Sequence, residues 1–133
     1  MRSKLRSNKL GEVFTPSWLV RELIDKIPDL FFEDKTKTYL DPACGSGNIL
    51  VEVLNKKIQH GSTPLQALQT TYGVDIMPDN VLECRKRLFE VAYKHDPSPT
   101  KKWETILLTN IRCANSLEKP LEEIFNVPPD KMM

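Results

Sequence analysis

Apolar side chains recur at helical spacing in three segments of the chain. These segments are residues 16–27, 47–60 and 78–93, and a repeat of three and four residues puts their apolar side chains on one helical face. In the third segment we expect Val81, Leu82, Leu88, Val91 and Ala92 to face inward, and Arg85, Lys86 and Arg87 to lie largely outside. Thr15 and Pro16 predict the start of the first helix, since a hydroxyl caps free N–H groups and proline suits the first helical position.

Short β-branched and aromatic segments separate these helices and are typical of buried strands. They are residues 36–41, 71–75 and 111–114. Shorter helices are expected at residues 64–68 and 120–125, and residues 103–108 fit either a helix or a strand, of which we favour the helix. Strands that alternate with helices indicate a parallel sheet with right-handed crossovers. The pattern therefore predicts an α/β fold with about three parallel strands flanked by helices.

Composition narrows the class of protein. A chain of 133 residues fits one domain. It can bury roughly two thirds of its unfolded surface, so its core does not depend on disulfides or metal ions. Its three cysteines are odd in number and form no C-x-x-C pair, and its two histidines stand apart. We therefore expect reduced thiols and no metal. No apolar run approaches the ~20 residues of a membrane span, and we expect a soluble, cytoplasmic protein.

The first ten residues form a basic arm. Arg2, Lys4, Arg6 and Lys9 occur there without an acidic residue among the first nine, although the net charge of the chain is only +1. Two interpretations remain open. The arm is a solvated tail, which we somewhat favour, or it binds DNA phosphates, which a strong salt dependence of DNA binding would indicate.

The segment with the clearest chemistry is residues 41–48, Asp-Pro-Ala-Cys-Gly-Ser-Gly-Asn, between a predicted strand and a predicted helix. Gly45 and Gly47 permit a tight turn and a close approach of backbone to a ligand, because glycine has no Cβ. A dinucleotide site would need a third glycine three residues after Gly47, where this chain has Leu50. This difference disfavours a nicotinamide cofactor.

Four segments together resemble the N6-adenine DNA methyltransferases of restriction-modification systems and their phage relatives. They are residues 11–16, 41–48, 72–76 and 110–117, in the order that the family has them. The resemblance implies a truncated, Rossmann-like S-adenosylmethionine-dependent methyltransferase fold over residues 11–125, followed by a tail at residues 126–133. Of the four segments, the first two are the specific ones.

The resemblance also implies roles for individual residues toward S-adenosylmethionine. Phe14, Thr15 and Pro16 would flank its methionine end, and Asp41 would hold its amino group, directly or through water. The turn would be lined by Pro42, Ala43, Gly45 and Gly47. Asp75 would accept hydrogen bonds from the two ribose hydroxyls, Ile76 would pack on the adenine, and Asn115 stands where the family has an aspartate that accepts from the adenine amino group. An amide oxygen can still accept that bond.

Purely structural roles are the alternative for each of these residues. Asp41 and Asp75 could cap the ends of strands or the helices that follow, and Phe14 and Ile76 could belong to the core. For any one residue taken singly the structural role is the more common. The joint order of the four segments favours the cofactor site.

The catalytic segment of the resembled family, Asn or Asp, then Pro-Pro, then Tyr or Phe, has no counterpart here. Residues 126–130, Asn-Val-Pro-Pro-Asp, resemble it only superficially, and we assign no catalytic residue. In the family's sheet the strand at residues 36–41 pairs with the catalytic strand, so we expect a second copy or a separate subunit to cover that edge. The alternative function is a non-catalytic decoy or regulator that binds a restriction-modification or nucleic-acid complex.

Overall fold

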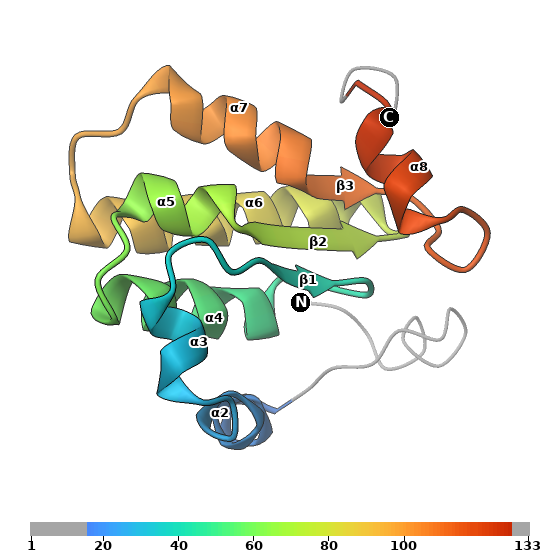
Figure 1. The fold of residues 1–133 in the computed structure, drawn as a ribbon. Helices are drawn as coiled ribbons and strands as arrows, with labels where there is room; N and C mark the ends of the chain where they lie inside the picture. The colour runs from blue at the N-terminus through green and yellow to red at the C-terminus, as the bar shows by residue number, and fades with distance from the viewer. Residues whose placement is uncertain (1–15, 129–133) are drawn as a thin grey trace.

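In the computed structural model, which describes residues 16–128, three parallel strands form one sheet with helices packed around it (Figure 1). The strands are β1 (Tyr39–Asp41), β2 (Thr71–Asp75) and β3 (Ile111–Cys113), in the spatial order β1-β2-β3. Tyr39 pairs with Thr71, and Gly73 pairs with Ile111. Each crossover between neighbouring strands contains helices, as a parallel connection requires. The predicted α/β class, with three parallel strands flanked by helices, is confirmed.

The described residues contain helices before, between and after the strands. They are α2 (Ser17–Asp25), α3 (Asp29–Glu33), α4 (Asn48–Gln59), α5 (Pro64–Gln69), α6 (Pro78–His95), α7 (Lys101–Asn110) and α8 (Leu121–Asn126). A capping box begins α5, since Thr63 accepts from the Gln66 N–H and Gln66 accepts from the Thr63 N–H. None of the helices within residues 16–128 has the length and apolar character that crossing a bilayer demands.

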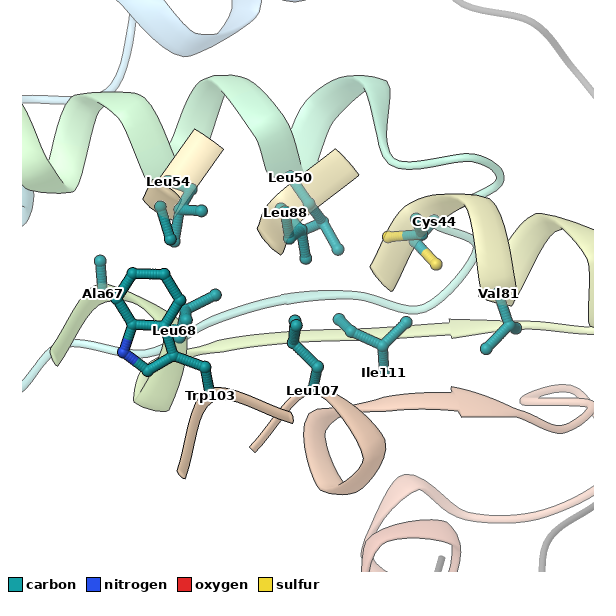
Figure 2. Close-up of a cluster of buried hydrophobic side chains, with 12 residues drawn as sticks. Cys44, Leu50, Leu54, Ala67, Leu68, Val81, Leu88, Trp103, Leu107 and Ile111 are labelled. Carbon is teal, nitrogen blue, oxygen red and sulfur yellow. The ribbon is translucent and has the colours of Figure 1, made fainter. Parts of the chain in front are cut away.

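The main apolar core lies where α4, α5, α6 and α7 meet the sheet. Leu50 and Leu54 of α4 point toward Trp103 and Leu107 of α7, with Leu88 of α6 beside them (Figure 2). A second cluster joins α2 and α3 to α4 through Val20, Ile24, Phe32 and Val53. The helical periodicity in the sequence therefore marks the faces that are buried here.

The two faces of the sheet have different covers, because side chains alternate along a strand. A Cβ on Gly73 would lie 2.7 Å from a methyl carbon of Leu50, so this position faces α4. The neighbouring Tyr72 faces the other way and makes an edge-to-face contact with Phe125 of α8, at 5.4 Å between ring centroids. A Cβ on Gly73 would also lie 3.0 Å from the Sγ of Cys44, so the turn between β1 and α4 lies on the same side of the sheet as α4.

Most predicted elements are present, with shifted ends. The segment at residues 103–108 lies in α7, the strand predicted for residues 36–41 begins only at Tyr39, and the short helix α3 was not predicted. Pro16 is the extended residue before α2 rather than its first helical residue. The prediction for Pro16 was therefore wrong by one position.

Two side-chain predictions for α6 were also wrong. Leu82 is 58% exposed, because it is rotated about 100° from Val81 on the helix and the buried face runs through Val81, Cys84 and Leu88. Arg85 and Arg87 are half-buried, and both donate hydrogen bonds to backbone carbonyl oxygens. Their long side chains reach acceptors that the local sequence does not reveal.

Candidate functional site

The turn between β1 and α4 has a backbone that only glycine adopts without strain. Gly45 has a φ of 55° and Gly47 a φ of 96°, in the left-handed region that other residues rarely enter. A Cβ on Gly47 would also lie 2.8 Å from the Sγ of Cys84 on α6. Gly47 is therefore required both by its conformation and by the close packing of the turn on α6.

Parallel pairing brings three of the four segments predicted to form a site, those that follow the strands, to one edge of the sheet. The N–H of Cys44, in the turn after β1, donates to the carbonyl of Val74 at 2.8 Å, and the N–H of Ala114 donates to the carbonyl of Asp75 at 3.0 Å. The Ser116 hydroxyl donates to the carbonyl of Pro42 at 2.9 Å. The loops after β1, β2 and β3 are thus linked to one another.

Asp75, the last residue of β2, connects the turn to α6. Its Oδ1 accepts from the N–H of Gly45 at 3.1 Å, and its Oδ2 accepts from the N–H of Met77 at 3.1 Å and from Nδ2 of Asn80 at 2.8 Å. The residue is only 9% exposed. A carboxylate has roughly four acceptor positions, so these bonds leave one on Oδ1. Asp75 therefore has a structural role and retains capacity for one hydroxyl donor.

Asp41, the last residue of β1, is half-buried and accepts at its Oδ1 from the N–H of Ala43 at 3.1 Å. Burial raises the pKa of this carboxyl, the Ala43 hydrogen bond opposes that change, and the negative charge of Asp75 adds to it. A carboxylate whose ionised form is disfavoured gains free energy from a cation beside it. The pair Asp41 and Asp75 therefore forms an acidic edge suited to a positively charged group.

The remaining predicted site residues within the described part have separate environments. Pro42 and Ala43 are exposed beside the turn, and Pro16 is exposed before α2. Ile76 is 55% exposed, so the alternative that it belongs to the core was wrong. Asn115 accepts at its Oδ1 from the N–H of Leu117 at 3.0 Å, and an amide oxygen has a second lone pair for another donor.

Some sequence predictions concern residues outside the described range. These residues are Arg2, Lys4, Arg6, Lys9, Phe14 and Thr15, together with the end of the segment at 126–130. The basic arm and the proposed contacts of Phe14 and Thr15 stay predictions. Of Phe14, Thr15 and Pro16, which are predicted to flank the methionine end of the cofactor, the structure describes only Pro16.

Two residues that organise the turn were missed by the sequence reasoning. Arg87 of α6 donates through one Nη1 to the carbonyl of Ser46 at 3.0 Å and to Oδ1 of Asn48 at 2.7 Å. Ser116, whose bond to Pro42 is described above, lies in the segment at residues 110–117, but no role was predicted for Ser116 itself. A signal for Arg87 existed, since it follows Cys84 by three residues and so borders the buried face of α6.

The outer edge of β1 carries no strand within residues 16–128. Its only strand partner among the described residues is β2, through the pairs Tyr39–Thr71, Leu40–Tyr72 and Asp41–Gly73. Unpaired backbone groups at such an edge can accept another strand. The same described residues contain no group of three His, Cys, Asp or Glu side chains arranged to hold a metal ion.

Comparison with known proteins adds two matches. The family described as N-6 DNA Methylase matches residues 3–127. The type II methyltransferase M.VspI of Vibrio sp. (strain 343) is 26% identical over 127 residues, which cover 96% of this chain and 27% of that protein. The chain thus spans about a quarter of the length of this relative. No solved structure matches the present chain.

Proposed function

This chain belongs to the N-6 DNA methylase family, and on that premise we propose that it binds S-adenosylmethionine at the carboxyl ends of its three strands. The observation that carries the proposal is the convergence of Asp41, Asp75 and Asn115 around the turn at Gly45 and Gly47. Ligands of open α/β sheets bind in this position, beyond the carboxyl ends of the strands.

Charge supports the proposed orientation of the cofactor. S-adenosylmethionine has a cationic amino group and a sulfonium, and the half-buried Asp41 with Asp75 nearby is an acidic region. We assign the amino group to Asp41. The methionine carboxylate is assigned to the start of α2 at Pro16, with Phe14 and Thr15, because backbone N–H groups at a helix N-terminus favour an anion.

The nucleoside end of the cofactor is assigned to β2 and β3. Asp75 has one acceptor position left by its three existing bonds, enough for one ribose hydroxyl. A second hydroxyl bond would have to replace one of the present donors. Ile76, exposed beside Asp75, provides an apolar surface for the adenine, and the Oδ1 of Asn115 accepts from its amino group.

We further propose that DNA is the substrate and that the catalytic groups come from another chain segment or subunit that pairs with the outer edge of β1. When bound, S-adenosylmethionine supplies an electrophilic methyl group. An exocyclic adenine amine then needs acceptors for its hydrogens and an aromatic face for the flipped base. The segment Asn-Val-Pro-Pro-Asp has no aromatic residue, and Val127 separates its Asn from the two prolines. The proposed location is the cytoplasm, where a restriction-modification methylase meets DNA.

Calorimetric titration of the 133-residue chain with S-adenosylmethionine tests the cofactor proposal. We expect a submillimolar Kd, which corresponds to at least roughly 4 kcal/mol. Asp41→Asn should weaken binding about tenfold, while Glu83→Gln, an exposed acidic residue on α6, should leave it unchanged. Absence of heat with the wild-type protein, or equal heats with NAD, contradicts the proposal.

The pH dependence of binding gives a second test. The pKa of Asp41 is raised by burial, so its carboxyl becomes protonated, and loses its attraction for a cation, at a higher pH than an exposed aspartate. Affinity should therefore fall as the pH is lowered from 7.5 to 5. Asp41→Asn should flatten this profile. A wild-type profile that is already flat would exclude Asp41 as the partner of the amino group.

Light scattering at micromolar concentration tests the proposal about the edge of β1. Pairing through a second copy predicts a dimer, and Leu40→Pro, which removes a backbone donor from β1, should reduce its population. A monomer at these concentrations excludes the second copy and leaves a separate subunit as the partner to be sought by co-expression.

A further inference from the structure

The turn at residues 44–48 is held by α6 as well as by its own backbone. One Nη1 of Arg87 donates to the carbonyl of Ser46 at 3.0 Å and to Oδ1 of Asn48 at 2.7 Å, and lies 3.5 Å from the Ser46 hydroxyl. Ser46 and Asn48 flank Gly47, the residue with a φ of 96°. A single guanidinium therefore spans the two sides of the glycine on which the turn depends.

Arg87 and Cys84 form one surface of α6 against this turn. They are three residues apart and so lie on the same side of the helix, and Gly47 packs so closely on Cys84 that a Cβ would come within 2.8 Å of its Sγ. Cys84 sets how near the turn can approach α6, and Arg87 holds it at that distance. Arg87 is separated in the chain by 41 positions from Ser46 and by 39 positions from Asn48.

The location of the Arg87 charge is unfavourable for the stability of α4 itself. A cation near a helix N-terminus opposes the helix dipole, and Asn48 is the first residue of α4. The hydrogen bonds that Arg87 donates offset this cost only while the turn keeps its present shape. The arrangement thus favours one conformation of the turn over others.

We propose that Arg87 is a positioning residue that holds the turn in its cofactor-binding conformation before the cofactor arrives. The inference rests on the proposed function, because it concerns the same site. Holding the backbone in place beforehand removes an ordering cost from binding. Arg87 acts through Ser46 and Asn48, and it needs no contact with the cofactor.

Arg85 provides a matched control on the same helix. Its Nε donates to the carbonyl of Ile111 at 3.0 Å, so it is also a half-buried arginine bound to a backbone carbonyl, but this carbonyl belongs to β3 and not to the turn. Arg85→Met and Arg87→Met should both lower the Tm. Only Arg87→Met should raise the Kd for S-adenosylmethionine, by about tenfold, and Arg87→Lys, which keeps a donor, should recover part of the affinity.

Hydrogen exchange without cofactor provides the readout that does not depend on binding. We expect the amides of residues 45–48 to exchange about tenfold faster in Arg87→Met than in wild type or Arg85→Met. An unchanged Kd in Arg87→Met, or an equal rise in Arg85→Met, overturns the inference. If Arg87→Met does not fold, Arg87→Lys decides by the same criteria.

The failures of the two proposals are distinguishable. A wild-type chain that binds no S-adenosylmethionine contradicts the proposed function, and unchanged exchange at residues 45–48 in the Arg87 variants then contradicts the positioning role as well. If the wild type binds the cofactor and the Arg87 variants bind it with equal affinity, the cofactor proposal is supported and the positioning role of Arg87 is contradicted.

Discussion

Two neighbouring lysines of α4 are held in opposite ways. Lys57 is 3% exposed, and its Nζ donates to the carbonyl of Lys37 at 2.9 Å, the carbonyl of Thr70 at 2.9 Å and the Thr70 hydroxyl at 2.6 Å. Lys56, rotated about 100° from Lys57 on the helix, makes an ion pair with the exposed Asp25 at 3.4 Å. Burial and acceptor type separate the two, although the sequence places them side by side.

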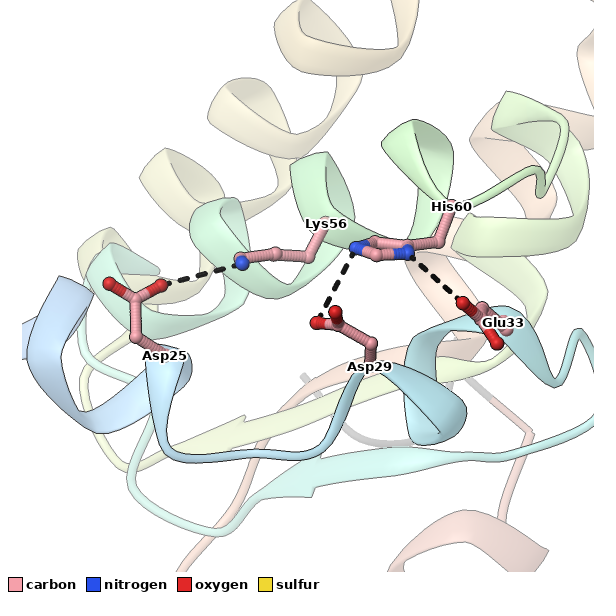
Figure 3. A network of polar contacts seen from close by, with 5 residues as sticks. All are labelled: Asp25, Asp29, Glu33, Lys56 and His60. Atoms are coloured by element: carbon pink, nitrogen blue, oxygen red, sulfur yellow. Dashed lines mark ion pairs between the residues drawn. The ribbon is translucent and has the colours of Figure 1, made fainter.

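Contacts like that of Lys56, between a partly buried basic side chain and an exposed acidic one, continue along the surface that α4 shares with α2 and α3. His60 lies 3.9 Å from a carboxylate oxygen of Asp29 and 4.0 Å from one of Glu33, in line with the pair of Lys56 and Asp25 (Figure 3). Surface ion pairs contribute about 0–1 kcal/mol, and the two His60 contacts are ion pairs only when the ring is protonated. These contacts therefore contribute little to the stability of this surface.

The buried pattern of Lys57 resembles that of the arginines around the sheet. Arg112 of β3 is 1% exposed and donates to the carbonyls of Thr109, Ile124 and Val127, with its guanidinium 5.8 Å from the ring centroid of Phe125. These buried cations donate to backbone carbonyl groups next to the strands. The comparison indicates that buried cations on carbonyls, and not surface ion pairs, hold the ends of the strands in place.

Lys57→Met should have the largest effect on stability. It removes the donor of two backbone carbonyls and a hydroxyl that are partly buried, which we expect to cost about 2–4 kcal/mol. Urea unfolding measures the loss, with Lys56→Met as the control on the neighbouring position. Equal losses in the two variants would contradict the comparison between the buried Lys57 and the partly exposed Lys56.

Glycine substitutions at the two ends of α4 should give the next largest effect. Gly47→Ala meets both a φ of 96° and the Cys84 sulfur, so we expect a loss of about 2–3 kcal/mol. Gly61→Ala, with a φ of 110° but no atom closer than 3.9 Å to the new Cβ, should lose only about 1 kcal/mol. Thermal unfolding compares them, and equal Tm values would show that packing on α6 does not matter.

The pH dependence of stability should sharpen the assignment of Lys57. Burial lowers the pKa of Lys57 to about 8, so between pH 8 and the ordinary lysine pKa the unfolded chain binds more protons and rising pH favours the folded state. Across this range, the free energy of unfolding of wild type should therefore rise by on the order of 1 kcal/mol relative to that of Lys57→Met.

A matched comparison isolates that gain from other titrations. Burial raises the pKa of Tyr39 and of Cys113, and both changes lower stability as the pH rises, but they are common to the two proteins. The difference between wild type and Lys57→Met at pH 7.5 and 9.5 therefore reports Lys57 alone. A difference that shrinks with pH would contradict the burial of its charge.

Lys56→Met should have the smallest effect, below about 0.5 kcal/mol. Its ion pair with Asp25 is open to solvent on the Asp25 side, so 0.5 M NaCl should reduce even this small contribution. Urea unfolding at low and high salt checks the expectation. A loss above 1 kcal/mol would mean that the α2 side of the fold depends on surface charge.

The extent of prediction from sequence differs between the fold and the site. The strand at residues 71–75 and the helices at residues 47–60 and 78–93 follow from local periodicity, and the structure contains each of them with ends within two residues. The grouping of Asp41, Asp75 and Asn115 at one edge of the sheet was also predictable, because parallel strands bring their carboxyl ends together. The short helix α3 carries too few residues for a periodic signal.

What the sequence by itself determined is the alternation of strands and helices, the glycine turn and the family, since each depends on residues close together or in fixed order. The tertiary structure alone decided which cations became buried. Arg87 meets Ser46, and Ser116 meets Pro42, across 41 and 74 positions of chain. Long side chains reach whichever carbonyl the packed elements leave without a donor, and that choice exists only after the helices have packed on the sheet.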